Sequence, residues 1–123
     1  MSSTLEQQRA EYALKSVTGF KGNETEKYRT LIKKLPAMIL NNGLGQALAF
    51  LLADAEGKNN KPSWRLYECL QKWIIQQGIY AEKFIESLMN EDRTKYMHAQ
   101  HETLKMLTWM TKFADAYLPK SGG

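Results

Sequence analysis

The chain has 123 residues, of which 43% are hydrophobic and 24% are charged, and its formal net charge is +4. These values fit one globular domain and exclude an intrinsically disordered chain. The single cysteine excludes an internal disulfide framework and agrees with a reducing compartment. The sequence contains neither a signal-peptide pattern nor an apolar run long enough for a membrane span, so we expect a cytoplasmic protein.

Hydrophobic residues recur with helical spacing in every long segment, which predicts an all-α fold. The first helix is predicted to begin at Ser3 or Thr4, because Ser3 with Glu6 and Thr4 with Gln7 both have the spacing of a capping box. It is predicted to end by Gly19 or Gly22. A second helix is predicted to start near Asn23. One of its faces is apolar and comprises Tyr28, Leu31, Ile32, Leu35 and Ile39.

The sequence Asn42-Gly43 is predicted to end the second helix, with Gly43 in a left-handed conformation. A strongly apolar third helix is expected at 44–55, followed by an exposed loop at 56–62. The later helices are predicted at 63–77, at 81–89, and from Asn90 or Asp92 to Leu118. The last helix carries an apolar seam of Tyr96, Ala99, Thr103, Met106, Met110, Phe113 and Tyr117. We therefore expect a compact bundle of five to six helices over residues 1–119 and a short flexible tail at 120–123.

The residue types that could support catalysis do not form a recognisable set. His98 and His101 lie on one side of the predicted last helix, with Glu102 beside them. Helical zinc motifs instead space two histidines by four residues with the glutamate between them. Cys69 lies among apolar positions, where a buried and unreactive thiol is expected. The sequence thus predicts no enzyme activity, no metal and no cofactor. The alternative is a metal-dependent enzyme built on His98, His101 and Glu102.

Two closely spaced glycines, Gly43 and Gly45, invite comparison with phosphate-binding loops. The lysine of a P-loop and the third glycine of the dinucleotide fingerprint are both absent. The pair therefore indicates either a helix end with a close helix contact, or backbone N–H groups that bind a phosphate or carboxylate. We take Asn42, Gly43, Gly45 and Gln46 as candidates for contact with a neighbouring protein.

Positive charge is in excess mainly in the first half of the chain. Residues 1–61 contain nine Lys and Arg against six Asp and Glu, whereas residues 62–123 contain eight against seven. Lys27 and Lys34 are expected to face solvent, opposite the apolar face of the second helix. If the basic faces of two helices adjoin, they form a stripe able to follow a phosphate backbone; otherwise they are a solvated surface. The candidates for phosphate contact are Lys27, Arg29, Lys33, Lys34, Arg65 and Lys72.

The chain carries the sequence LPAMI at residues 35–39 and NGLGQALAF at residues 42–50. This pattern resembles the signature of the small subunit of the Cmr complex, the type III-B CRISPR RNA-guided effector of antiviral defence. Residues 8–13 and Tyr28 are similar to the early helices of that family. The segments 96–102, 107–109 and 112–114 are similar to its last helix.

The resemblance implies a compact helical protein without catalytic activity of its own. Several copies would stack in a minor filament and line the path of the target RNA. The implied partners are other Cmr subunits, further copies of this chain, and the duplex of crRNA with target RNA or the single-stranded target, with no membrane and no small-molecule substrate. The alternative is a purely structural helical adaptor that makes no contact with nucleic acid.

Overall fold

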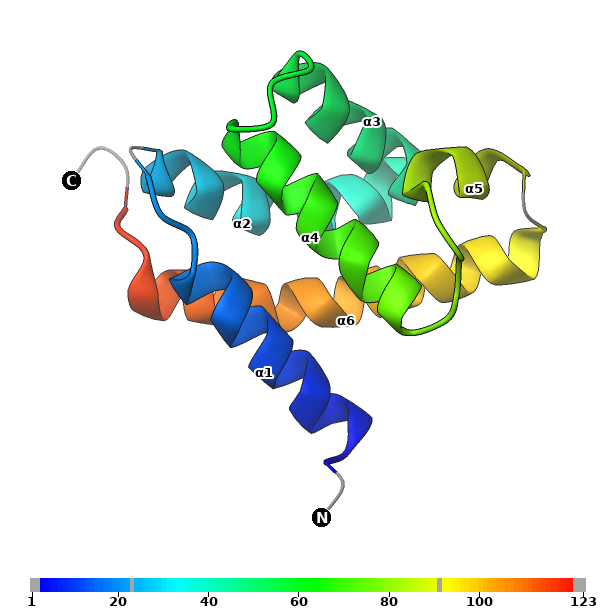
Figure 1. Ribbon diagram of the computed structural model, residues 1–123, viewed down its shortest axis with the longest axis horizontal. Coiled ribbons are helices and arrows are strands. Elements are labelled where there is room, and N and C mark those ends of the chain that lie inside the picture. Colours follow the sequence, from blue (N-terminus) through cyan, green and yellow to red (C-terminus); the bar gives the residue numbers. More distant parts are fainter. Residues whose placement is uncertain (1–2, 23, 91, 121–123) are drawn as a thin grey trace.

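The computed structural model describes residues 3–22, 24–90 and 92–120. All regular structure in these ranges is helical, in six helices arranged as in Figure 1. They are α1 (Leu5–Thr18), α2 (Thr25–Asn42), α3 (Leu44–Ala55), α4 (Pro62–Gln76), α5 (Phe84–Asn90) and α6 (Arg93–Tyr117). The prediction of an all-α fold with a long C-terminal helix is confirmed. In the described part of the chain, no helix is long and apolar enough to cross a membrane.

Local sequence decides where the first and last helices begin. The backbone N–H of Gln7 donates to Thr4 Oγ1 at 3.1 Å, and the N–H of Thr4 donates to Gln7 Oε1 at 2.7 Å. Of the two predicted capping boxes, that of Thr4 and Gln7 is therefore present. At the start of α6, Asp92 Oδ1 accepts a hydrogen bond from the N–H of Lys95 at 2.9 Å. The predicted start of the second helix, Asn23, lies outside the described residues.

The fifth helix begins three residues later than predicted, at Phe84 rather than Ala81. Its first backbone donors are satisfied by side chains of α4. The N–H of Phe84 donates to Gln71 Oε1 at 2.9 Å, and the N–H of Ile85 donates to the hydroxyl of Tyr67 at 3.2 Å. The start of α5 is thus set by a tertiary contact, which hydrophobic spacing along the chain does not reveal.

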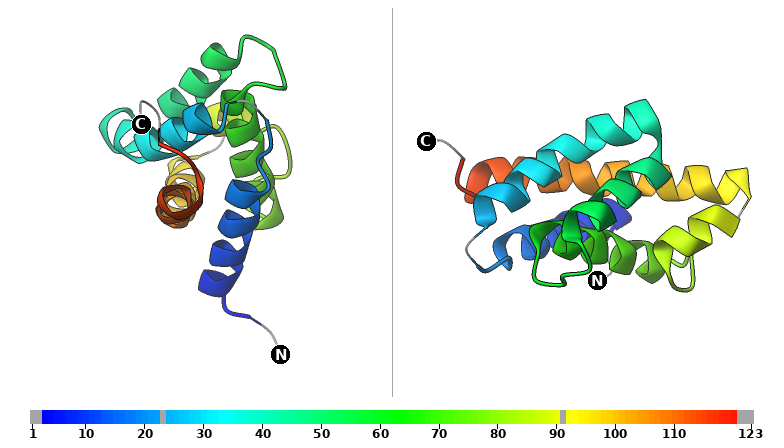
Figure 2. Two further views of the ribbon diagram at one scale, coloured as in Figure 1. Left: turned by 90° about the vertical axis from the view of Figure 1, so that its left-hand side faces the viewer. Right: turned by 90° about the horizontal axis from the view of Figure 1, so that it is seen from above.

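The helices pack around one continuous apolar core. Helix α6 contacts α1 and α2, and α3 contacts α2 and α4, as the views in Figures 1 and 2 also show. The predicted apolar face of α2 is confirmed, because all five of its side chains are buried: Tyr28, Leu31, Ile32, Leu35 and Ile39. Trp73 of α4 and Phe84 of α5 are also large side chains that are fully buried in this core.

The apolar seam of α6 is buried only in its middle. Ala99, Thr103, Met106 and Met110 are buried, whereas Tyr117 is 61% exposed. A helix of 25 residues is about 37 Å long, longer than the neighbouring helices that cover it. The expected seam therefore continues into an aromatic end that no neighbouring helix fully covers.

Candidate nucleic-acid interface

The four predicted cations of α2 lie in two separate places. Lys27 and Lys34 border the side of α2 that faces α3. The Nζ of Lys27 is 3.4 Å from Asp54 Oδ2, and the Nζ of Lys34 is 5.3 Å from the centre of the Phe50 ring. Lys34 is exposed, as expected, whereas Lys27 is half-buried. Both lysines contact α3, so they flank the apolar face of α2 rather than lie opposite it.

Arg29 and Lys33 lie on the other border of the apolar face and share one carboxylate of α6. Arg29 Nη2 is 2.6 Å and Lys33 Nζ is 2.5 Å from Asp115 Oδ1. The hydrogen bond from Lys33 is the main reason that the pKa of Asp115 is lowered, and the charges of both cations act in the same direction. These three side chains together keep one net positive charge at the surface.

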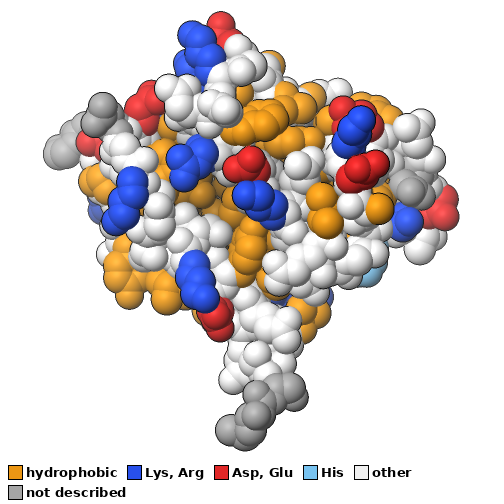
Figure 3. Space-filling view, viewed as in Figure 1, with side chains coloured by type: hydrophobic (Ala, Val, Ile, Leu, Met, Phe, Trp, Pro, Cys, Tyr) orange, Lys and Arg blue, Asp and Glu red, His pale blue; other side chains and the backbone are white. Residues whose placement is uncertain are grey.

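The two predicted cations of α4 line the same hollow, between α1 and α4. This hollow has a volume of about 220 Å³, and its wall includes Arg65, Lys72, Tyr12 and Phe20. Lys72 Nζ lies 3.7 Å from the carboxylate of Glu68, one turn earlier in α4. Lysines and arginines are spread over this face, and several lie beside a carboxylate (Figure 3). The α4 pair therefore shares one surface, as its spacing predicts.

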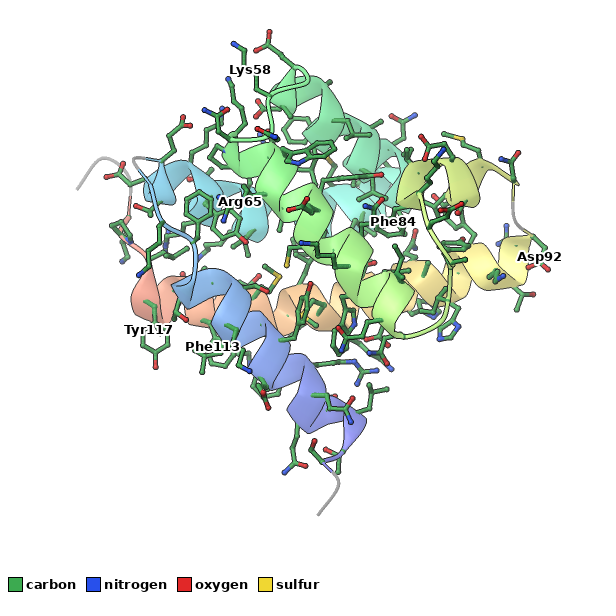
Figure 4. The ribbon with its side chains drawn as sticks, viewed as in Figure 1. Lys58, Arg65, Phe84, Asp92, Phe113 and Tyr117 are labelled. Atoms are coloured by element: carbon green, nitrogen blue, oxygen red, sulfur yellow. The ribbon has the colours of Figure 1, made fainter. Side chains whose placement is uncertain are left out.

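Arg65 is held in a three-membered stack. Its guanidinium carbon lies 5.3 Å from the centre of the Phe20 ring, and Phe20 stacks on Tyr28 with 4.1 Å between ring centres and 8° between planes. Figure 4 shows Arg65 where α4 passes the segment that joins α1 and α2. Among the described residues, no carboxylate lies within ion-pair distance of Arg65. The stacking orients the guanidinium and leaves its N–H groups available for an anion.

Two further lysines near the hollow were missed by the sequence argument. Lys15 of α1 lines the same hollow but pairs with Glu11 at 2.8 Å. Lys21, after α1, lines an adjoining hollow of about 290 Å³ that also has Arg65 in its wall. Neither lysine belongs to a cluster of charge in the sequence, so only the tertiary structure brings them close to Arg65. The six predicted cations thus form three separate groups rather than one stripe.

The glycine turn between α2 and α3 is covered by side chains of α6. The N–H of Gly45 donates to the Tyr96 hydroxyl at 2.8 Å, and the N–H of Leu44 donates to Gln100 Oε1 at 3.0 Å. A Cβ atom added to Gly43 would lie 3.2 Å from the Tyr96 hydroxyl. These contacts explain why both positions are glycine: Gly43 ends α2, and α6 packs closely against the turn. They also occupy two of the backbone donors that a phosphate would need.

The conformation of the turn differs in detail from the prediction. Gly43 has a positive φ of 89°, as expected of a glycine that ends a helix, but its ψ of 160° is extended rather than left-handed helical. Asn42 and Gln46 are exposed on either side of the turn. A contact of these two residues with a neighbouring protein stays a prediction.

The three residues considered as metal ligands, His98, His101 and Glu102, do not lie on one surface. His98 and His101 are exposed, whereas Glu102 is 5% exposed and bound on the inner side of α6. Within the described ranges, no three His, Cys, Asp or Glu side chains are placed to hold a metal ion. The Cys69 side chain packs against the core, and burial raises the pKa of its thiol. These groups are therefore not arranged for the metal-dependent chemistry considered as an alternative.

A buried ion pair that the sequence argument missed connects three helices. Arg9 Nε and Nη2 of α1 donate to the two carboxylate oxygens of Glu102 in α6, at 2.7 and 2.8 Å, and Trp73 Nε1 of α4 donates to Glu102 Oε2 at 2.9 Å. Burial alone raises the pKa of Glu102, but the hydrogen bonds from Arg9 and Trp73 and the charge of Arg9 outweigh it, and the net shift is downward. The sequence does indicate this pair indirectly, because Arg9 and Glu102 are charged residues within the apolar faces of α1 and α6.

This fold and this surface can be compared with known proteins. A profile described as "CRISPR-associated protein (Cas_Cmr5)" matches residues 5–117. A Thermus thermophilus protein described as "CRISPR system Cmr subunit Cmr5" is 28% identical over 100 residues, which are 80% of this chain and 81% of the relative. A crystal structure of a Cmr5 family protein from Thermus thermophilus aligns with a TM-score of 0.71 and 28% identity, and covers 94% of this chain and 97% of that chain.

These matches place the chain in the class of CRISPR-associated helical proteins. The chain belongs to the Cas_Cmr5 family. The resemblance to the small subunit of the Cmr complex, drawn from segments 35–39 and 42–50, is therefore confirmed.

Proposed function

We propose that this chain is a non-catalytic small subunit of a cytoplasmic type III-B CRISPR effector. It stacks with further copies of itself in a minor filament and helps to hold target single-stranded RNA along a basic surface. The assembly role is inferred from the Thermus thermophilus relative, whose description names it a subunit of the Cmr system. The RNA role is inferred from the surface itself.

The main observation that supports RNA contact is the orientation of Arg65 and its charge, which is unpaired within the described residues. Its guanidinium is oriented by Phe20, has no ion pair among the described residues, and lies between two hollows. An arginine fork that is fixed in this way matches the geometry of a phosphate and needs little further ordering to bind it. Phosphate contacts carry no base information, so binding is expected to be independent of sequence, with a Kd of about 10⁻⁴–10⁻⁶ M at physiological salt.

The non-catalytic role is supported by what the reactive side chains do. The carboxylate of Glu102 accepts three hydrogen bonds inside the bundle, from Arg9 and Trp73. The thiol of Cys69 has a raised pKa, which favours the unreactive protonated form. Each group is therefore committed to the structure of the bundle rather than to a substrate.

Contact with neighbouring subunits is supported by exposed apolar side chains. Leu40, near the end of α2, is 70% exposed, and Met89, near the end of α5, is 71% exposed. Leu40 lies two residues before Asn42, so it extends the predicted interface at Asn42 and Gln46. Burial of such side chains against another protein is favourable, by about 1.5–3 kcal/mol for each large one that is fully covered.

The test is the salt dependence of RNA binding, measured by fluorescence anisotropy with a labelled single-stranded oligouridylate. Arg65→Ala is expected to weaken binding and to reduce the slope of log K against log salt by about 0.7, the value for one phosphate contact on a single strand. Arg65→Lys keeps the charge but lacks the fork, so it should bind with intermediate affinity. Lys83→Ala removes an equal charge away from the hollow and serves as the control.

A purely structural adaptor remains the second candidate because most of the predicted phosphate contacts are engaged within the chain. Lys27, Arg29, Lys33 and Lys72 each lie within 4 Å of a carboxylate. An adaptor would bind no RNA at any salt concentration, and charge reversal of Lys33 and Lys34 would leave the function of the assembled complex intact. Absence of binding would exclude the proposed RNA contact, whereas an unaffected Lys33 and Lys34 variant would exclude only these two lysines of α2 from it.

A further inference from the structure

Helix α6 concentrates positive charge on its exposed side. Between Arg93 and Ala114 it contains four lysines and arginines and a single acidic residue, Glu102. That carboxylate is buried and neutralised by Arg9, so it does not offset the charge at the surface. The next acidic residue of the helix, Asp115, is held by two cations of α2. The positive charge on the exposed face of α6 therefore comes from Lys105 and Lys112.

Four of the exposed basic side chains of α6, two histidines and two lysines, follow one line along the helix. His98, His101, Lys105 and Lys112 are exposed and are separated by three, four and seven residues, which places them on the same face. They extend over about 21 Å at 1.5 Å per residue. Among the described residues, neither Lys105 nor Lys112 has a carboxylate within ion-pair distance. We refer to these four residues as the α6 basic line.

A row of aromatic rings lies beside the C-terminal part of the α6 basic line. Trp109 and Phe113 have ring centres 5.8 Å apart, and Phe113 and Tyr117 have ring centres 6.4 Å apart. Figure 4 shows Phe113 and Tyr117 pointing away from the bundle at the end of α6, and hydrophobic side chains gather at this lower-left edge in Figure 3. Because Tyr117 is 61% exposed, one face of the row is open to a ligand.

Trp109 is fixed in place next to a lysine. Its Nε1 donates to Glu6 Oε1 of α1 at 2.6 Å. Trp109, Glu6, Thr108 and Lys112 line a hollow of about 180 Å³. The hollow therefore combines the edge of an aromatic ring, a hydroxyl group, an ammonium group and the carboxylate of Glu6. Arg9 pairs with both Glu6, at 2.8 Å, and Glu102, so these three groups together carry one net negative charge.

We propose that the exposed face of α6 is a second surface for single-stranded RNA, in which the α6 basic line contacts phosphates and the row Trp109–Phe113–Tyr117 stacks against bases. Positive groups that follow the backbone and aromatic rings that receive bases are the two features of sequence-independent single-strand binding. Lysines alone would be enough to bind an acidic protein partner. The exposed aromatic row beside them is not needed for such a partner and therefore favours RNA. The inference rests on the proposed RNA function but concerns residues apart from the hollow of Arg65.

The experiment compares matched variants of the full chain in the anisotropy assay with an oligouridylate of about 15 nucleotides. Lys105→Ala with Lys112→Ala removes two contacts of the line, and is expected to weaken binding about ten-fold at 50 mM salt and to reduce the salt slope by about 1.4. Lys58→Ala with Lys83→Ala removes the same charge from two exposed positions outside α6, and is expected to change the slope by less than half as much. This control separates local contacts from net charge.

The aromatic row is tested at its most exposed member. Tyr117→Ala is expected to weaken binding about five-fold or more, whereas Tyr117→Phe keeps the ring and is expected to bind as the wild type does. Circular dichroism of each variant checks that the helices are retained. Because Tyr117 is mostly exposed, the fold should tolerate both changes.

The possible results distinguish this inference from the function on which it rests. If the wild type binds RNA, and Arg65→Ala weakens binding while the lysine pair of α6 and Tyr117→Ala do not, the α6 surface is refuted and the proposed function stands. If both lysine pairs reduce the slope equally, binding follows net charge and the α6 surface is also refuted. If the wild type shows no salt-dependent binding, both proposals fail.

Discussion

Replacement of Arg9 by methionine tests the buried ion pair that joins α1, α4 and α6. The side chains of Arg9 and Glu102 are 7% and 5% exposed, and Arg9 donates two of the three hydrogen bonds that the carboxylate accepts. Arg9→Met fills much of the same volume with apolar atoms. It leaves the Glu102 carboxylate buried with Trp73 as its remaining partner.

The size of the effect follows from this geometry. Loss of one partner of a buried pair costs about 3–5 kcal/mol, because the other charge stays buried without compensation. For 123 residues the unfolding entropy is about 0.26 kcal/mol/K, so Tm is expected to fall by about 12–19 °C. Adding Glu102→Gln removes the stranded charge and is expected to recover most of the loss. Lys15→Met, which breaks an exposed pair with Glu11 on the same helix, should leave Tm nearly unchanged.

The pH dependence of this effect has a defined sign. In the wild type the pKa of Glu102 is lowered on folding, so the pair stabilises the fold above the ordinary carboxyl range and this contribution is lost as the pH falls through the folded-state pKa. In Arg9→Met, burial without the guanidinium raises the pKa of Glu102 and favours its neutral form. The difference in stability between wild type and variant should therefore shrink on acidification.

The assay is urea denaturation followed by circular dichroism, at about pH 7 and about pH 4.5, near the ordinary pKa of a glutamate. A loss below about 1 kcal/mol at neutral pH would contradict the reasoning, because it would mean that the buried charge is solvated or paired elsewhere. A loss that is large but does not shrink at the lower pH would assign the effect to packing rather than to the charge of Glu102.

The remaining predictions concern the glycine turn and the cysteine. Gly43→Ala should destabilise the fold by about 1–3 kcal/mol in urea denaturation, because φ is +89° and the new Cβ would lie 3.2 Å from the Tyr96 hydroxyl. Gly45→Ala, in the helix and 3.4 Å from the same atom, should be about neutral, so equal losses at both glycines would contradict this account. Tyr96→Phe removes the acceptor for the Gly45 N–H and should cost about 1 kcal/mol by the same measurement. Cys69 is half-buried and its thiol has a raised pKa, which predicts alkylation by iodoacetamide at least about ten-fold slower in the folded than in the urea-unfolded protein; equal rates would refute this protection of the thiol.

Properties that depend on neighbours along the chain were predicted well from the sequence. The capping box of Thr4 and Gln7 and the buried face of α2 each involve residues within a few turns of one helix. The spacing of side chains along a helix is fixed by its geometry, so the pattern of apolar residues identifies the buried face before any packing is known. The family signature at 35–39 and 42–50 is likewise a local pattern, and it was confirmed.

Properties that depend on which helices meet were not available from the sequence. Arg9 and Glu102 are 93 residues apart and form one ion pair only because α1 crosses α6. The cations of α2 form one basic group along the chain, but the packed helices divide them: Lys27 and Lys34 contact α3, and the other two pair with Asp115 of α6. Sequence alone determined that this protein is a helical bundle with an excess of positive charge. Only the tertiary structure decided which of those charges are neutralised, because an ion pair across two helices requires their side chains to come within a few ångströms.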